Sequence, residues 1–191
     1  MTGTAIPYGA IVHYGAAEGT LTLKNTELIA PVAGTADEIN SASPSVIGVA
    51  AWAQTGENID EAWKLVVTDC TIRTNGFAVF DRWNNATYTN TTFTGLEGVE
   101  GLDDIEVKTC YMALNNPHAN DVTYDHCTFR NMRSWGMLVA GEELTVTDCT
   151  FDGTNQSCAI SVAYGTIDKC TITGNTFDLS GSGSGIMFSG A

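Results

Sequence analysis

An eight-residue pattern that recurs along the chain constrains its fold more than any other feature. The pattern alternates apolar and polar residues, reaches a polar position, and resumes with Cys or Thr. Copies occur at 21–28, 65–72, 86–93, 105–112, 122–129 and 144–151, and they align one slot that holds Thr26, Cys70, Thr91, Cys110, Cys127 and Cys149. Recurrence at a period of about 20 residues predicts the coils of a solenoid. The 44 residues between the first two slot residues predict two coils.

Each copy predicts two short strands that meet at an angle, because the period-two alternation shifts phase at the polar position. In the copy at 144–151, Leu144 and Val146 point inward before the corner, and Cys149 and Phe151 point inward after it. Asn and Asp tolerate left-handed backbone at such corners. The corner positions are Asn25, Asp69, Asn90, Thr109, His126 and Asp148. Third strands are expected at 9–13, 45–49, 76–80, 136–139, 159–162 and 185–188.

The last coil can be aligned in two ways. Residues 166–172 fit the repeat with Cys170 in the cysteine slot, and residues 170–177 fit it in a register shifted by five residues. We favour the first alignment.

The repeats resemble those of right-handed parallel β-helix proteins, the pectate-lyase-like superfamily. Their Cys-Thr-Phe form, at 127–129 and 149–151, also resembles coils of bacterial surface adhesins and polymorphic outer-membrane proteins. The resemblance implies an all-β, right-handed parallel β-helix solenoid of about seven coils with three short strands each. We expect one domain over residues 1–191. Because neither end shows a cap, we expect it to be a segment of a longer protein whose uncapped coils associate end to end.

Charge and hydropathy narrow the range of partners. The net charge is −14, from 22 acidic and 8 basic residues, so the chain repels nucleic acid and anionic lipid. No run approaches the roughly 18 apolar residues of a membrane span. The segment holds no export signal, and its extracellular or cell-surface localisation is an expectation from the adhesin resemblance.

The cysteines are expected to form a free, inward-pointing ladder. Stacked coils place equivalent side chains about 4.8 Å apart and parallel, whereas a disulfide needs side chains that converge. A hydroxyl in this slot is expected to lack a partner. No metal site is expected, because there is no CxxC and the three histidines fall at unrelated slots.

The resemblance implies where catalysis would occur. Pectin-degrading members of the superfamily act on the outward face of the strand after the Cys-Thr-Phe unit, which is expected to hold here Gly48, Ala78, Glu100, Leu138, Ser161 and Met187. Glycoside hydrolysis needs two nearby carboxylates, and this face offers one. We therefore assign no catalytic residue, and a polysaccharide lyase or glycoside hydrolase is kept as the alternative.

Aromatic and polar residues at the next corner are the candidate ligand-binding site: Trp52, Trp63, Asp81, Arg82, Trp83 and Tyr164. Aromatic rings beside such polar groups suit a glycan or a surface protein. The competing interpretation is that the tryptophans cover the rim of the core. The function expected is a non-catalytic β-helix of adhesin type, with a purely structural stalk as a further alternative.

One acidic run is the only candidate cofactor-binding site in the sequence. It contains Glu97, Glu100, Asp103, Asp104 and Glu106, and carboxylates at such spacing can bind Ca²⁺. Because the run lacks the spacing of a known calcium loop, a solvated surface is the preferred interpretation and no cofactor is expected.

Overall fold

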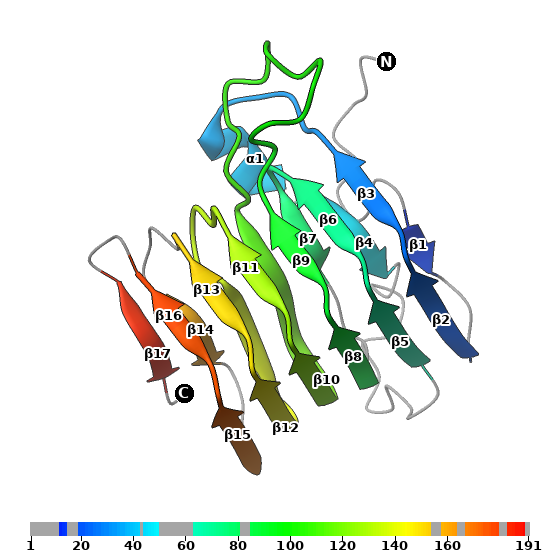
Figure 1. Cartoon of the computed structure of the whole chain (residues 1–191), viewed down its shortest axis with the longest axis vertical. Helices are drawn as coiled ribbons and strands as arrows, with labels where there is room; N and C mark the ends of the chain where they lie inside the picture. The colour runs from blue at the N-terminus through cyan, green and yellow to red at the C-terminus, as the bar shows by residue number, and fades with distance from the viewer. Residues whose placement is uncertain are drawn as a thin grey trace.

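The computed structural model describes residues 12–14, 19–42, 44–49, 63–80, 85–153, 158–163, 167–179 and 183–189. Over these residues the chain is all-β, and its paired strands are parallel (Figure 1). Three rows of strands stack coil upon coil and enclose one elongated core. The predicted parallel β-helix is confirmed.

Each row forms one sheet of the solenoid. The first sheet contains β2 (Gly19–Lys24), β5 (Trp63–Thr68), β8 (Asn85–Thr89), the second halves of β10 (Met112–Asp125) and β12 (Met137–Thr147), and β15 (Lys169–Thr173). The second contains β3 (Glu27–Ala30), β6 (Thr71–Thr74), β9 (Thr92–Thr94), β11 (Thr128–Arg130), β13 (Thr150–Asp152) and β16 (Thr176–Asp178). The third contains β1 (Val12–Tyr14), β4 (Ser45–Val49), β7 (Phe77–Phe80), the first halves of β10 and β12, β14 (Cys158–Ala163) and β17 (Ser184–Ser189).

Left-handed backbone forms the corner between the first and second sheets. Five predicted corner residues have φ between 48° and 53°: Asn25, Asp69, Asn90, His126 and Asp148. Gly174, with φ of 68°, occupies the corner of the last coil. Because Asn, Asp and Gly adopt this conformation at low cost, the chain can turn sharply between two strands in every coil.

Three register predictions were wrong. The 44 residues between Thr26 and Cys70 form one coil, because β2 pairs directly with β5. Residues 105–112 are not a repeat: Cys110 makes only an isolated bridge with Met132, and Thr109 is not a corner. The last coil adopts the second alignment, in which Cys170 pairs with Leu144.

Aromatic stacking explains the register of the last coil. Phe93, Phe129, Phe151 and Phe177 stack in sequence, with ring centroids 5.1, 4.6 and 4.9 Å apart. The second alignment extends this stack by pairing Phe177 with Phe151. The first would instead put Ile172 beside Phe151 and interrupt the aromatic stack.

The cysteines of the slot form no disulfide bonds, as predicted. The prediction that a hydroxyl in this slot would lack a hydrogen-bond partner was wrong. All six cysteines are free, and five are buried. Thr26, Cys70, Thr91, Cys127 and Cys149 each donate to the carbonyl two residues earlier, at 2.9 to 3.5 Å. The slot therefore suits a small side chain with one donor, which explains why both Thr and Cys occur there.

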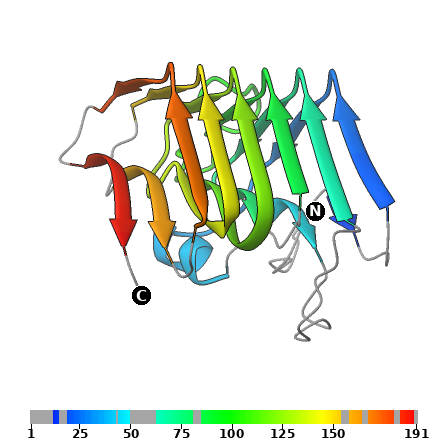
Figure 2. The ribbon, with the colours of Figure 1, turned by 90° about the horizontal axis from the view of Figure 1, so that it is seen from below.

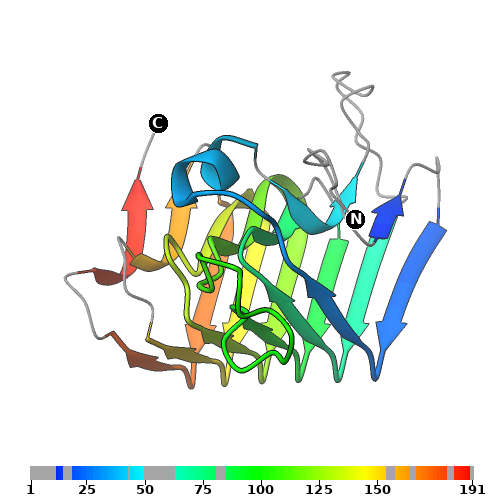
Figure 3. The same cartoon turned by 90° about the horizontal axis from the view of Figure 1, so that it is seen from above.

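Two excursions depart from the coils. Residues 31–44 include helix α1 (Ala36–Ala42), where the Thr35 amide donates to Glu38 Oε2 at 2.8 Å and the Glu38 amide to Thr35 Oγ1 at 3.4 Å. This reciprocal cap stabilises a short helix. Residues 95–111 form the second excursion, between β9 and β10. Figures 2 and 3 show α1 lying outside the coils, against the third sheet. In the described part of the chain, no helix is long and apolar enough to cross a membrane.

Arg133 connects both excursions to the coils. Its Nη2 donates to Asn40 Oδ1 of α1 at 2.9 Å, and its Nη1 donates to the Thr109 carbonyl at 2.9 Å. The guanidinium also lies 5.2 Å from the centre of the Tyr111 ring. Burial lowers the pKa of Arg133.

Candidate functional site

Most of the predicted aromatic corner lies outside the described residues. Trp52, Asp81, Arg82, Trp83 and Tyr164 belong to segments that the structure does not describe. Trp63 begins β5, where its backbone pairs with Gly19. In chain order, residues 81–84 and 164–166 connect third-sheet strands to first-sheet strands, so the corner stays a prediction.

The third-sheet face, where the resemblance placed catalysis, is buried at Ala78, Leu138 and Ser161, whereas Met187 in the last coil is half-buried. Ala78 and Ser161 are 0% exposed and Leu138 is 5% exposed. Leu138 joins Phe77 and Met112 in an apolar cluster separate from the main core, with Tyr111 and Trp135 packed against it. A substrate could not reach these strands without displacing packed apolar side chains.

Glu100, predicted for that face, is not on a strand. It lies in the excursion at 95–111 and is exposed. The prediction failed because it depended on counting residues 105–112 as a repeat. The third-sheet strand of that coil instead begins at Met112, which pairs with Phe77.

The outer face of the first sheet carries two in-register rows in which most residues are threonine; we call them the threonine rows. Each row runs along the solenoid axis, with one residue from each coil. The first row is Thr22, Val66, Thr87, Thr123, Thr145 and Thr171, and the second is Lys24, Thr68, Thr89, Asp125, Thr147 and Thr173. The residues between them, such as Tyr88 and Val146, point into the core. Ideal parallel-strand geometry spaces neighbouring positions about 4.8 Å apart along a row and about 6.6 Å apart between rows.

The corner beside this face brings together two carboxylates and an imidazole. Ligand atoms of Asp125, His126 and Asp148 all lie within 4.8 Å of one another. His126 Nδ1 and Asp125 Oδ1 are 2.8 Å apart, and this hydrogen bond lowers the pKa of Asp125 and raises that of His126. The sequence placed His126 and Asp148 in the corner slot, but did not reveal that successive corners gather their side chains.

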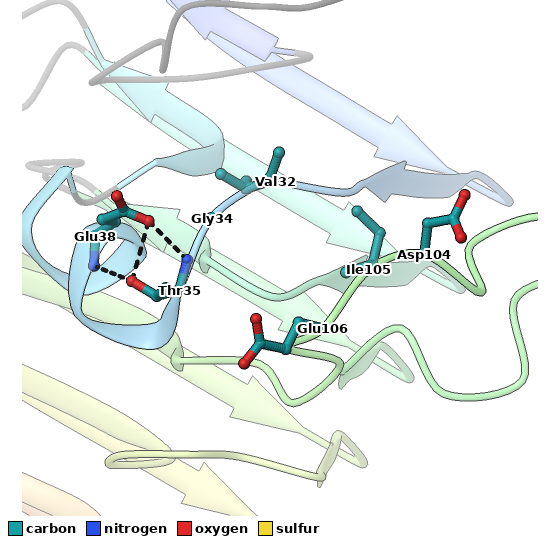
Figure 4. A pocket seen from close by; sticks show the side chains of 8 residues that line it. Val32, Gly34, Thr35, Glu38, Asp104, Ile105 and Glu106 are labelled. Carbon is teal, nitrogen blue, oxygen red and sulfur yellow. Dashed lines mark hydrogen bonds between the residues drawn. The ribbon is translucent and has the colours of Figure 1, made fainter.

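A small pocket of about 240 Å³ lies between the two excursions (Figure 4). Val32 and Ile105 supply apolar lining, and the carboxylates of Glu38, Asp104 and Glu106 surround it. Glu38 is already engaged by the backbone amide and the hydroxyl of Thr35. The predicted acidic run contributes two residues here. In the described residues its carboxylates do not form a set of converging metal ligands.

The buried thiols of Cys110 and Cys127 are poor nucleophiles. Burial raises the pKa of Cys110 to about 12. The interaction with Cys149, together with burial, raises the pKa of Cys127, whereas the hydrogen bond from Cys127 lowers that of Cys149. Because the thiolate is the reactive form, Cys110 and Cys127 serve as packing groups and donors.

The comparison with protein families agrees with the strand pairing. The family model described as the right handed beta helix region matches residues 55–191. The chain belongs to this family. No curated protein and no solved structure matches the chain. Membership specifies the β-helix fold and leaves the activity open.

Proposed function

We propose that this chain is a non-catalytic β-helix of adhesin type, exposed outside the cell or on its surface, that binds a glycan along its first sheet. The glycan would lie on the threonine rows and against the aromatic corner. The observation that carries the proposal is the contrast between two faces. The third-sheet face is buried at Ala78, Leu138 and Ser161, whereas the first-sheet face presents regularly spaced hydroxyls.

The chemistry of the threonine rows suits a polymer of sugars. Each hydroxyl can donate one hydrogen bond and accept two, and the rows repeat these groups at every coil. Thr87 is exposed, and its neighbours Thr123 and Thr145 are half-buried, so the row borders solvent. A flat, periodic surface favours an extended ligand over a small one.

The predicted aromatic corner would add ring surface at the edge of this face. Trp63 starts a first-sheet strand, and Trp83 precedes β8 by two residues. Aromatic side chains combine a large apolar surface with a polar group, which suits the mixed surface of a sugar ring. The aromatic rings would supply most of the affinity for the glycan, and the threonine hydroxyls would orient it.

Binding to a panel of acidic and neutral glycans, followed by calorimetry on the best ligand, tests this function. The double variant Thr123→Ala/Thr145→Ala should weaken binding about thirtyfold, because two hydroxyl contacts at roughly 1 kcal/mol each are lost. Thr128→Ala/Thr150→Ala is the matched control, since these residues form an equivalent aligned pair on the second sheet. Trp83→Ala tests the aromatic corner separately.

Three results would overturn the proposal. Equal losses in the two double variants would show that the first-sheet face is not the site. Binding to no glycan would favour a structural stalk or a protein partner. Cleavage of any polysaccharide in a turnover assay on the same panel would establish a carbohydrate-active enzyme instead.

A further inference from the structure

The corner of two successive coils holds an arrangement that is not found at the other corners in the described part of the chain. Asp125 ends the first-sheet strand of one coil, and His126 forms the corner after it. Asp148 forms the corner of the next coil, where Asp125 pairs with Thr147. All three side chains are at least partly exposed to solvent. One imidazole and two carboxylates therefore reach the same point from adjacent coils.

The corner residues Asp69 and Asn90, which also lie in successive coils, provide a comparison. Asn90 Nδ2 donates to Asp69 Oδ1 at 2.7 Å, so the Asp69 carboxylate has a neutral partner in the neighbouring coil. Among the described residues, no asparagine side chain donates a hydrogen bond to the Asp148 carboxylate in the way that Asn90 donates to Asp69. On its other side the next corner is Gly174, where a Cβ atom would overlap the Asp148 carboxylate. Glycine therefore leaves the space that this carboxylate occupies.

We propose that Asp125, His126 and Asp148 bind one divalent transition-metal ion of the Zn²⁺ class, which would link two coils at their corner. An imidazole with carboxylates is a donor set that suits zinc, nickel and copper. The Thr147 hydroxyl lies 3.1 Å from Asp125 Oδ1 and can orient this ligand from behind. Ca²⁺ is disfavoured, because it takes six to eight oxygen ligands. The inference does not rest on the proposed glycan binding, although Asp125 and Thr147 belong to the second of the two first-sheet rows.

Calorimetric titration of the folded 191-residue chain with ZnCl₂ tests the site. The wild type should bind one ion, and His126→Asn and Asp148→Asn should each weaken binding by roughly tenfold or more. Both variants should fold, because Asn already occupies the corner at Asn25 and Asn90 with the same positive φ. Asp69→Asn is the control: it removes a corner carboxylate that has no histidine beside it, and should leave zinc affinity unchanged.

Nuclear magnetic resonance gives an independent readout on the same samples. Zinc should shift the His126 imidazole signals at one equivalent, and CaCl₂ at the same concentration should not. The inference is overturned if the wild type binds no zinc at millimolar concentration. It is also overturned if His126→Asn, with a native circular dichroism spectrum, binds zinc as tightly as the wild type, because other histidines or thiols would then be the ligands.

Discussion

The slot residue after each corner has the same two roles in successive coils: its side chain donates a hydrogen bond and packs inward. Thr26, Cys70 and Thr91 lie in consecutive coils, and each donates to the carbonyl two residues earlier. That carbonyl ends a first-sheet strand, where the chain turns away. A side-chain donor at this point adds a hydrogen bond beside the backbone ladder, and the rest of the side chain packs inward. Thr and Cys meet both needs, which accounts for the repeat.

The variants Cys70→Thr and Cys70→Val, whose new side chains have the same shape, should separate the contribution of the hydrogen bond from that of inward packing. Thr keeps a donor for the Thr68 carbonyl, which Cys70 Sγ contacts at 3.2 Å, whereas Val has the same shape without a donor. We expect Cys70→Thr to change the free energy of unfolding by less than about 0.5 kcal/mol, and Cys70→Val to lower it by about 1 kcal/mol. Urea unfolding measures both. Equal stability of the two variants would contradict the role of the donor.

Cys110 makes stability sensitive to alkaline pH. Burial raises its pKa from 9.0 to about 12 in the folded chain, so above pH 9 the unfolded chain loses a proton that the folded chain keeps. Stability from this thiol is thus complete below pH 9 and is lost as pH rises toward 12, at up to about 1.4 kcal/mol per pH unit. Unfolding of wild type and Cys110→Ala between pH 8 and 11 measures the effect. The variant should show the shallower decline, and parallel declines would contradict it.

At the scale of elements, the two excursions depend on one side chain from a later coil. Helix α1 has only seven residues, too few to be stable alone. Its Ile39 is 1% exposed, and Arg133 binds Asn40 in α1 and Thr109 in the second excursion. The planar guanidinium is what allows one residue to contact both segments.

Arg133→Lys should loosen both excursions and leave the coils intact. A lysine keeps the charge but loses the fork that reaches Asn40 and Thr109 together, at a cost of about 2 kcal/mol in local stability. Hydrogen exchange should therefore accelerate in residues 36–42 and 95–111 and stay slow in β11 and β13. Arg130→Lys is the control, because Arg130 forms an exposed pair with Asp152 at 2.8 Å. Unchanged exchange in α1 would contradict this role of Arg133.

At the scale of the whole molecule, the last coil is the least buried part of the described chain. Among the described strands, β16 and β17 lie at the ends of their rows, and β15 pairs only with β12. Ile186 is 39% exposed and Phe188 63% exposed. Unpaired strand edges with exposed apolar side chains are templates for another chain.

We predict that the 191-residue chain self-associates end to end through this coil. Sedimentation velocity over a concentration series should show dimers or longer species, because pairing would bury Ile186 and Phe188 and satisfy strand edges. Phe188→Lys should shift the equilibrium toward monomer. Val66→Lys, on the first-sheet face, is the control and should leave it unchanged. A monomeric wild type at high concentration would contradict the prediction.

The sequence alone was sufficient to predict the repeating unit, because residues close together in the chain determine it. Alternation at period two specifies which side chains point inward, and left-handed backbone at Asn25, Asp69 and Asn90 specifies the corner. These features identified the parallel β-helix and the inward thiols. They could not distinguish Cys110 or Cys170 from true slot residues, since the local sequence around each resembles the repeat.

Only the tertiary structure decided which segments pair, since pairing depends on residues far apart in the chain. Insertions between strands leave the coil closed at little cost in loop entropy, so chain length could not show that Thr26 and Cys70 lie in adjacent coils. Stacking of Phe177 on Phe151 fixed the last register. The gathering of Asp125, His126 and Asp148 likewise arises from the stacking of successive corners, whose side chains meet only when two coils are in contact.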